Sequence, residues 1–126
     1  MARLKEIVFD ATHPARLARF WAAALEGYHV RAYDQVEIER LAGLGFTPET
    51  DPTVMVDGPG PSLCFQTFPG PARGRGAVHL DIVGMDLARE MQRLMTLGAR
   101  LRDQHAGHAV MSDPEGNTFC VRAPRP

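Results

Sequence analysis

The stretch "DPEGNTFCV", Asp113 to Val121, decides the fold, because it sets a tight turn against a short apolar strand and occurs twice in the chain. Pro, Gly and Asn in close succession favour a turn. An approximate copy, "DGPGPSLCF", begins earlier in the chain at Asp57. The copies carry the chain's two cysteines, Cys64 and Cys120, at matching positions. The sequence therefore predicts two similar halves.

The repeat continues through the rest of the chain. "EIVFDATHPARLARFW" from Glu6 matches "HLDIVGMDLAREMQRL" from His79 at an offset of 73, and "GYHVR" matches "GARLR" at an offset of 71. "VMVDGPGPSLCFQ" matches "VMSDPEGNTFCVR" at an offset of 56, with no gap. Because the offset between matching segments falls from 71 to 56, the first copy is predicted to carry an insertion, from Gln35 to Glu49. Within it, "VEIERLAGLG" predicts a short helix.

The alternation of apolar residues predicts a strand, a helix and three further strands in each copy. Strands are expected near 4–10, 28–33, 53–57, 62–68, 77–83, 99–103, 108–112 and 117–123, and helices near 14–25 and 86–97. The predicted fold class is therefore α+β, with two pseudo-symmetric βαβββ modules at about 1–69 and 77–126 forming a single domain. The Pro/Gly/Arg-rich segment "PGPARGRG", residues 69–76, is the predicted linker.

Composition narrows the classes of function. Hydrophobic residues make up 44% of the 126 residues and charged residues 23%, which is typical of a folded globular protein. A net charge of -1 does not favour a nucleic-acid partner. No apolar run approaches the roughly 20 residues needed to cross a bilayer, so we expect no membrane partner and a cytoplasmic location. We expect the two cysteines to be free thiols.

Successive side chains of a strand point to opposite faces, and four of the predicted strands combine an apolar face with a polar one. The polar faces carry Cys, His, Gln, Glu and Asp and hardly any Lys. This mixture favours a ligand-lined cavity over a solvated sheet surface. The predicted ligand-binding residues are Asp10, Cys64, Gln66, Asp81, Cys120 and Arg122.

The paired modules, the helix "HPARLARFWAAALEGY", the strand "HLDI" and the turn "DPEGNTFCV" resemble the vicinal oxygen chelate superfamily, specifically its glyoxalase-like branch. The resemblance runs from about Leu4 to Ala123. It implies curved mixed sheets around a common cavity, a small-molecule ligand and a homodimer. It also implies that metal-dependent members hold a divalent ion with side chains from the first and fourth strands of each module.

Carried over to this sequence, the metal positions fall on Glu6, Cys64, His79 and Cys120, with Gln66 as the alternative to Cys64. The family usually has His or Gln, then Glu, His and Glu, so only His79 keeps the pattern. Thiols replace both glutamates, which puts hard octahedral metal chemistry in doubt. We expect a degenerate metal site and no cofactor, and a divalent metal (zinc, nickel, iron or manganese) is the alternative.

Three functions remain open. The first is small-molecule binding in a polar-floored cavity. The second is catalysis by a lyase or isomerase that uses Glu6 and His79 as an acid–base pair, or a divalent metal. The third is a non-catalytic assembly module.

Overall fold

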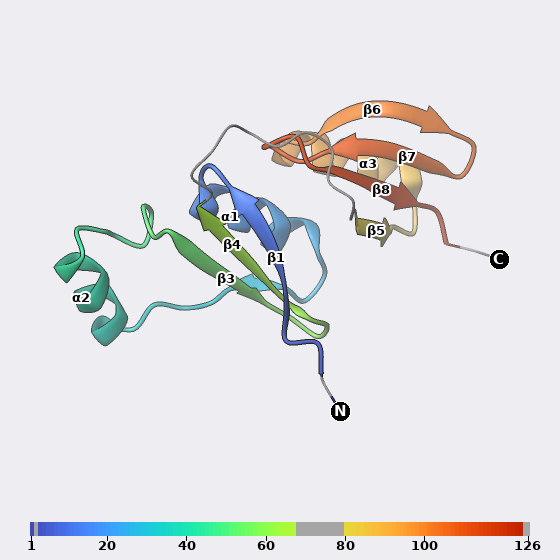
Figure 1. Ribbon diagram of the computed structural model, residues 1–126. Helices are drawn as coiled ribbons and strands as arrows, with labels where there is room; N and C mark the ends of the chain where they lie inside the picture. The colour runs from blue at the N-terminus through green and yellow to red at the C-terminus, as the bar shows by residue number, and fades with distance from the viewer. Residues whose placement is uncertain (2, 68–79, 125–126) are drawn as a thin grey trace. The chain divides into compact units, whose positions relative to one another are not determined.

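The computed structural model describes residues 1, 3–67 and 80–124, and the chain divides into two compact units, Met1–Gly70 and Pro71–Pro126 (Figure 1). The first unit contains β1 (Glu6–Ala11), α1 (Pro14–Ala24), β2 (His29–Val30), α2 (Gln35–Gly43), β3 (Thr53–Asp57) and β4 (Ser62–Thr67). The second contains β5 (Leu80–Val83), α3 (Leu87–Leu97), β6 (Arg100–His105), β7 (His108–Ser112) and β8 (Thr118–Arg122).

Each unit forms a four-stranded mixed sheet with the same topology. Sheet A has the order β1-β4-β3-β2 and sheet B the order β5-β8-β7-β6. The first and last strands of each unit pair in parallel, and the other pairings are antiparallel. A parallel pair needs a crossover connection, which includes α1 in the first unit and α3 in the second. The predicted α+β class with two βαβββ modules is confirmed.

Helix bounds and strand register confirm most of the repeat. Helix α3 begins and ends at an offset of 73 from α1 (87 − 14 and 97 − 24). Cys64 lies opposite Val8, and Cys120 lies opposite Asp81, which is again offset by 73 from Val8 (81 − 8). The two cysteines therefore occupy equivalent positions in the two sheets.

The prediction that the third and fourth strands match without a gap is wrong by one residue. Met55 lies opposite Cys64 and Val110 opposite Cys120, so the third strands differ by 55 (110 − 55) and the cysteines by 56 (120 − 64). The loop between β7 and β8 is thus one residue longer than the loop between β3 and β4. Asp57 is equivalent to Ser112 and not to Asp113, whose Oδ1 accepts turn hydrogen bonds from backbone N–H groups.

One face of each sheet packs against the helix of its own unit. In the first unit Trp21 of α1 is 1% exposed and stacks on Phe9, which in turn stacks on Phe65 at 5.1 Å between ring centroids. In the second unit Leu94 of α3 and Phe119 of β8 are fully buried. Among the described residues, no helix is long and apolar enough to span a membrane.

Two helix ends show why the elements begin and stop where they do. Pro14 opens α1, a position where its missing N–H costs nothing. Gly98 closes α3 with a φ of 119°, a left-handed conformation that glycine adopts without strain. Strand β2 is shorter than the expected 28–33, because the chain leaves the sheet soon after Arg31 to enter α2. The predicted linker 69–76 and residues 77–79 lie outside the described residues.

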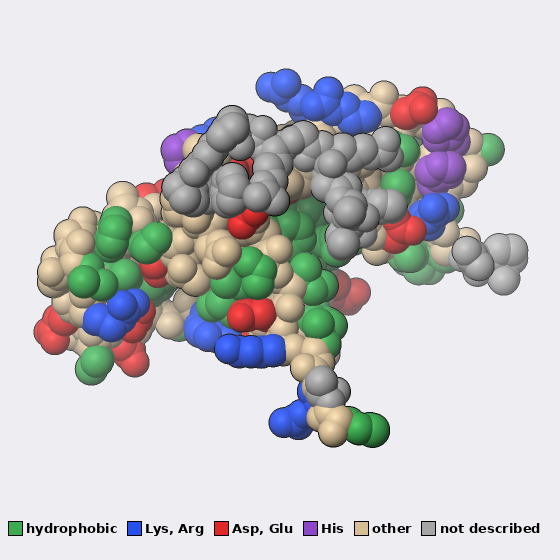
Figure 2. Space-filling model, viewed as in Figure 1, with side chains coloured by type: hydrophobic (Ala, Val, Ile, Leu, Met, Phe, Trp, Pro, Cys, Tyr) green, Lys and Arg blue, Asp and Glu red, His purple; other side chains and the backbone are tan. Residues whose placement is uncertain are grey.

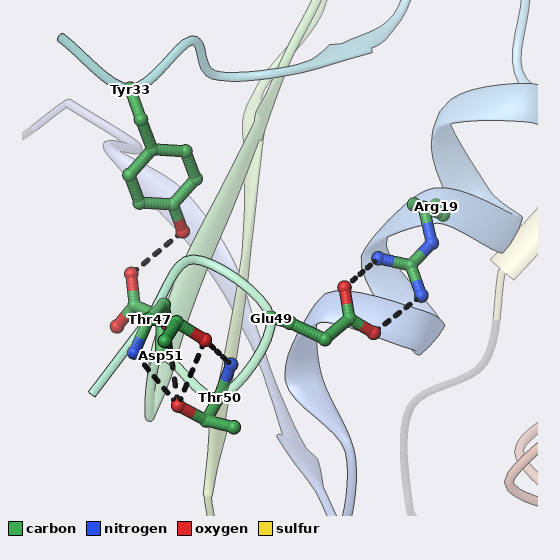
Figure 3. A network of polar contacts seen from close by, with 6 residues as sticks. All are labelled: Arg19, Tyr33, Thr47, Glu49, Thr50 and Asp51. Carbon is green, nitrogen blue, oxygen red and sulfur yellow. Dashed lines mark hydrogen bonds and ion pairs between the residues drawn. The ribbon is translucent and has the colours of Figure 1, made fainter. Parts of the chain in front are cut away.

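The helix predicted in the inserted segment is confirmed as α2, which stands apart from sheet A at the end of two connections (Figure 1). Asp34 caps it by accepting a hydrogen bond from the backbone N–H of Glu37. Beyond the helix, two contacts hold the returning chain to the unit (Figure 3). Tyr33 donates a 2.7 Å hydrogen bond to the buried Asp51, and exposed Arg19 forms a bidentate ion pair with Glu49.

These two contacts should differ in strength. Tyr33→Phe leaves a buried carboxylate oxygen of Asp51 without its donor, so we expect the free energy of unfolding to fall by about 1–2 kcal/mol. Arg19→Gln breaks an exposed ion pair, and we expect a loss below about 0.5 kcal/mol. Urea unfolding of both variants measures the difference. Equal losses would contradict the assignment of Tyr33–Asp51 as the main attachment of the insertion.

Candidate ligand-binding site

The face of sheet A turned away from α1, here called the distal face of sheet A, carries the predicted polar residues of the first unit. Parallel pairing places them in rows across β1 and β4. The rows are Glu6 opposite Ser62, Val8 opposite Cys64, and Asp10 opposite Gln66. Strand β3 extends these rows with Thr53 opposite Gln66 and Met55 opposite Cys64.

The middle of this face is apolar. Cys64 lies between Val8 on one side and Met55 on the other, and it is only 5% exposed. Val8 is 47% exposed and lies on β1, an edge strand of sheet A. Figure 2 shows hydrophobic side chains alternating with charged ones over the strands of this unit. Small-molecule sites also combine apolar surface with a few placed polar groups.

One end of the face is organised by Arg31, which follows β2. Its Nε donates to Asp57 Oδ2 at 2.7 Å and its Nη2 donates to Oδ1 at 2.8 Å. The Ser62 hydroxyl donates to the same Oδ1 at 2.7 Å. These hydrogen bonds, the Arg31 bonds first, lower the pKa of Asp57 from 3.8 to about 2. The carboxylate is therefore held ionised in a fixed orientation.

The pKa of the Cys64 thiol is shifted in the opposite direction from that of Asp57. Burial, followed by the negative charge of Glu6, raises its pKa above the ordinary value. A thiol with a raised pKa stays protonated near neutral pH and is a weak nucleophile. Cys64 therefore contributes shape and apolar surface to the distal face of sheet A.

The predicted residues of the second unit lie on the corresponding face of sheet B. Asp81 pairs with Cys120, and Arg122 Nε donates to Asp81 Oδ2 at 2.9 Å. Both charged side chains are more than two fifths exposed, at 42% for Arg122 and 45% for Asp81. At the β6–β7 hairpin His105 and His108 stack at 4.7 Å between ring centroids, where the histidines gather in Figure 2.

The structure thus joins some predicted site residues and not others. Asp10 and Gln66 share a row, as do Asp81 and Cys120. Glu6 lies on the row of Ser62, two residues along β1 from the row of Cys64. His79 lies outside the described residues, so the Glu6–His79 pair stays a prediction.

Sequence reasoning missed the arginine–carboxylate end of the face. Arg31, Asp57 and Ser62 were not among the predicted site residues, although the last two alternate with Met55 and Cys64 along predicted strands. Alternation alone could have placed them on the polar face. The alignment without a gap obscured the place of Asp57 on the polar face, because it matched this residue to the turn residue Asp113.

The described members of the predicted metal set fit a hard divalent cation poorly. Manganese and magnesium prefer oxygen and imidazole ligands, whereas Cys64 and Cys120 would supply sulfur. In sheet A the row partners of Cys64 are Val8 and Met55, which offer no hard donor. Over the described ranges, no three His, Cys, Asp or Glu side chains gather closely enough to hold a metal ion.

The ion pair at Arg31 predicts a specific acid sensitivity. Because the folded pKa of Asp57, about 2, is below its ordinary 3.8, its stabilising effect is present above pH 4 and is lost as the pH falls towards 2. Asp57→Asn should lower the free energy of unfolding by about 1 kcal/mol at pH 6, and by progressively less from pH 4 to 2. Denaturant unfolding across this range measures it. An Arg31→Gln variant that kept the full acid dependence of the wild type would contradict the mechanism.

Comparisons with known proteins agree with this architecture. A glyoxalase/bleomycin resistance/dioxygenase family enzyme from Burkholderia phytofirmans PsJN has a TM-score of 0.68 at 12% identity, covering 97% of this chain and 98% of its own. The fosfomycin resistance protein FosX from Mesorhizobium loti has a TM-score of 0.68 at 13% identity, covering 99% and 94%.

A mutant FosX from Listeria monocytogenes, solved with Mn(II) and 1S,2S-dihydroxypropylphosphonic acid, has a TM-score of 0.66 at 12% identity, covering 99% of this chain and 94% of its own. At such identities the likeness is one of fold. No curated protein sequence matches the chain. The family model described as glyoxalase-like domain matches residues 6–122. The chain therefore belongs to the glyoxalase-like domain family and has the fold of the glyoxalase/bleomycin resistance/dioxygenase superfamily.

Proposed function

We propose that the chain binds a small organic molecule on the distal face of sheet A. The observation that carries the proposal is the combination of an apolar centre, Val8, Cys64 and Met55, with the oriented Arg31–Asp57 pair at one end. An apolar body of a ligand would lie over Val8 and Met55, and its polar groups would meet the row of Asp10 and Gln66 or the ion pair.

Energetic reasoning favours a ligand over simple exposure to solvent. A half-exposed valine gives little to folding but suits a partner that covers it. Burying apolar surface contributes roughly 25 cal/mol per Å², and a few placed polar groups then provide specificity. The structural neighbour solved with a phosphonic acid supports the proposal, because it binds a small molecule within the same fold.

We also propose that the protein does this without a resident metal and as a homodimer. The donor set supports the first point, because the family resemblance implies glutamates at the positions of Cys64 and Cys120, and thiols are poor ligands for hard cations. The second point follows from the family resemblance alone, and light scattering of the purified chain measures it.

The ligand proposal is tested by a compound screen read by thermal unfolding. A ligand present at about 100 times its dissociation constant should stabilise the folded protein by about 2.7 kcal/mol. Val8→Lys should abolish the shift, because it places a charged chain over the apolar centre. Val36→Lys is the matched control: Val36 is 75% exposed on α2, so the same change there should leave the shift intact.

Two results would overturn the ligand proposal. One is a broad screen of small organic molecules that yields no stabilising compound for the wild type. The other is a stabilising compound whose effect is the same in Val8→Lys, Val36→Lys and the wild type, since such a compound binds elsewhere.

The metal proposal has its own measurement. Protein purified without a chelating tag should contain zinc, nickel, iron and manganese only at levels far below stoichiometric by elemental analysis. Ligand stabilisation should be unchanged after dialysis against EDTA, because no protein–metal–ligand bridge is needed. A stoichiometric metal whose removal abolishes the ligand shift would refute this proposal.

A further inference from the structure

Two arginines hold equivalent positions in the two units and have different partners. Val30 pairs with Val56, and Leu101 pairs with Met111. Arg31 directly follows Val30, and Arg102 directly follows Leu101. The two arginines differ by the repeat offset of 71 (102 − 31). Arg31 binds the carboxylate of Asp57, whereas Arg102 Nε donates to the hydroxyl of Ser112 at 3.0 Å.

The first unit shows what this arrangement of donors accommodates. Asp57 Oδ2 accepts from Arg31 Nε, and Asp57 Oδ1 accepts from both Arg31 Nη2 and the Ser62 hydroxyl, all between 2.7 and 2.8 Å. The guanidinium and the hydroxyl thus form a cradle for a carboxylate. In the first unit the chain fills this cradle with its own side chain.

In the second unit the same cradle is only half filled. Ser112 replaces Asp57 at the third-strand offset of 55 (112 − 57), and its Oγ takes the role of Oδ2. Thr118 replaces Ser62 at the fourth-strand offset of 56 (118 − 62) and pairs with Ser112. Among the described residues, Ser112 is the only hydrogen-bond partner of the Arg102 guanidinium. No acceptor from the described residues takes the role of Oδ1.

The surroundings leave this guanidinium charged and accessible. Arg102 is exposed and sits where the β6–β7 register shifts between Leu101 and Asp103, a bulge of the kind that often re-aims a side chain beside a site. The neighbouring acids are engaged. Asp103 pairs with His105 at 2.9 Å, and the buried Asp113 accepts hydrogen bonds within its own turn.

We infer that the second unit binds the carboxylate group of a small organic acid at Arg102 and Thr118, where the buried Ser112 holds Arg102 Nε in place. One ligand oxygen accepts from Arg102 Nη2 and from the Thr118 hydroxyl, as Asp57 Oδ1 does from Arg31 and Ser62. The site lies within the second unit and needs neither the ligand proposed for sheet A nor its residues. Its failure and the failure of the proposed function are therefore distinguishable.

Acetate is the probe for this site. In NMR titrations of the isotope-labelled full chain, the side-chain Nε–H signal of Arg102 should shift with acetate and saturate. Arg102→Gln should weaken acetate binding, followed at the Thr118 amide signal, by at least about tenfold, the effect of losing a charged hydrogen bond. Arg100→Gln is the matched control, since it removes the same charge from the same strand, and it should change binding by less than about twofold.

Exchange of the two acceptors provides a reciprocal test. Asp57→Ser gives the first unit the composition of the second, so the Arg31 Nε–H signal should gain a saturable response to acetate. Ser112→Asp fills the second cradle from within, so the Arg102 response should disappear. Thermal unfolding of each variant checks that it is folded. If Ser112→Asp does not fold, Arg102→Lys replaces it in the test, because lysine keeps the charge and lacks the planar set of donors of the guanidinium.

The inference is overturned if Arg102→Gln and Arg100→Gln weaken acetate binding equally, because binding would then follow net charge alone. It is also overturned if folded Asp57→Ser shows no acetate response at Arg31, or if Arg102→Lys binds acetate as tightly as the wild type. A site-specific loss at Arg102 together with the gain at Arg31 establishes it.

Discussion

Each unit has a single helix packed against its four-stranded sheet, and strand geometry allows that helix to bury only one of the two faces. In the first unit this constraint sends Phe9 and Phe65 towards Trp21 and leaves their neighbours, Val8 and Cys64, on the distal face. The residues of the candidate site that lie on strands are thus placed by the same alternation that builds the core. Core and site cannot be shifted independently, since a slip of one residue would exchange them.

The repeat of the fold also places an arginine and its hydrogen-bond acceptor at equivalent positions in the two units. The arginine after the second strand is kept in both units, while its acceptor is Asp57 in one and Ser112 in the other. In the first unit the ion pair is internal and stabilises the fold. In the second unit the partner is a neutral hydroxyl, which is the basis of the binding site proposed at Arg102. The same arginine position thus has a charged acceptor in one unit and a neutral one in the other.

The resemblance to the vicinal oxygen chelate superfamily implies metal ligands on the first and fourth strands of each module. Here the fourth strands supply Cys64 and Cys120 at equivalent positions, and Cys64 is buried with a raised pKa. The oriented charges of sheet A lie where Arg31, which follows β2, pairs with Asp57 of β3.

The sequence by itself determined the repeat, the α+β class, the equivalence of Cys64 with Cys120 and the faces on which Asp10, Gln66, Asp81 and Arg122 lie, because these follow from offsets and from a period of two. It could not decide which residues on a face touch. The Arg31–Asp57 pair and the one-residue difference between the hairpin loops emerged only from the pairing register, which depends on hydrogen bonds between strands distant in sequence. Residues of the same type, such as Asp57 and Asp113, can match in a sequence alignment and still occupy different structural positions. Only the tertiary structure shows which residues of the neighbouring strand lie opposite them.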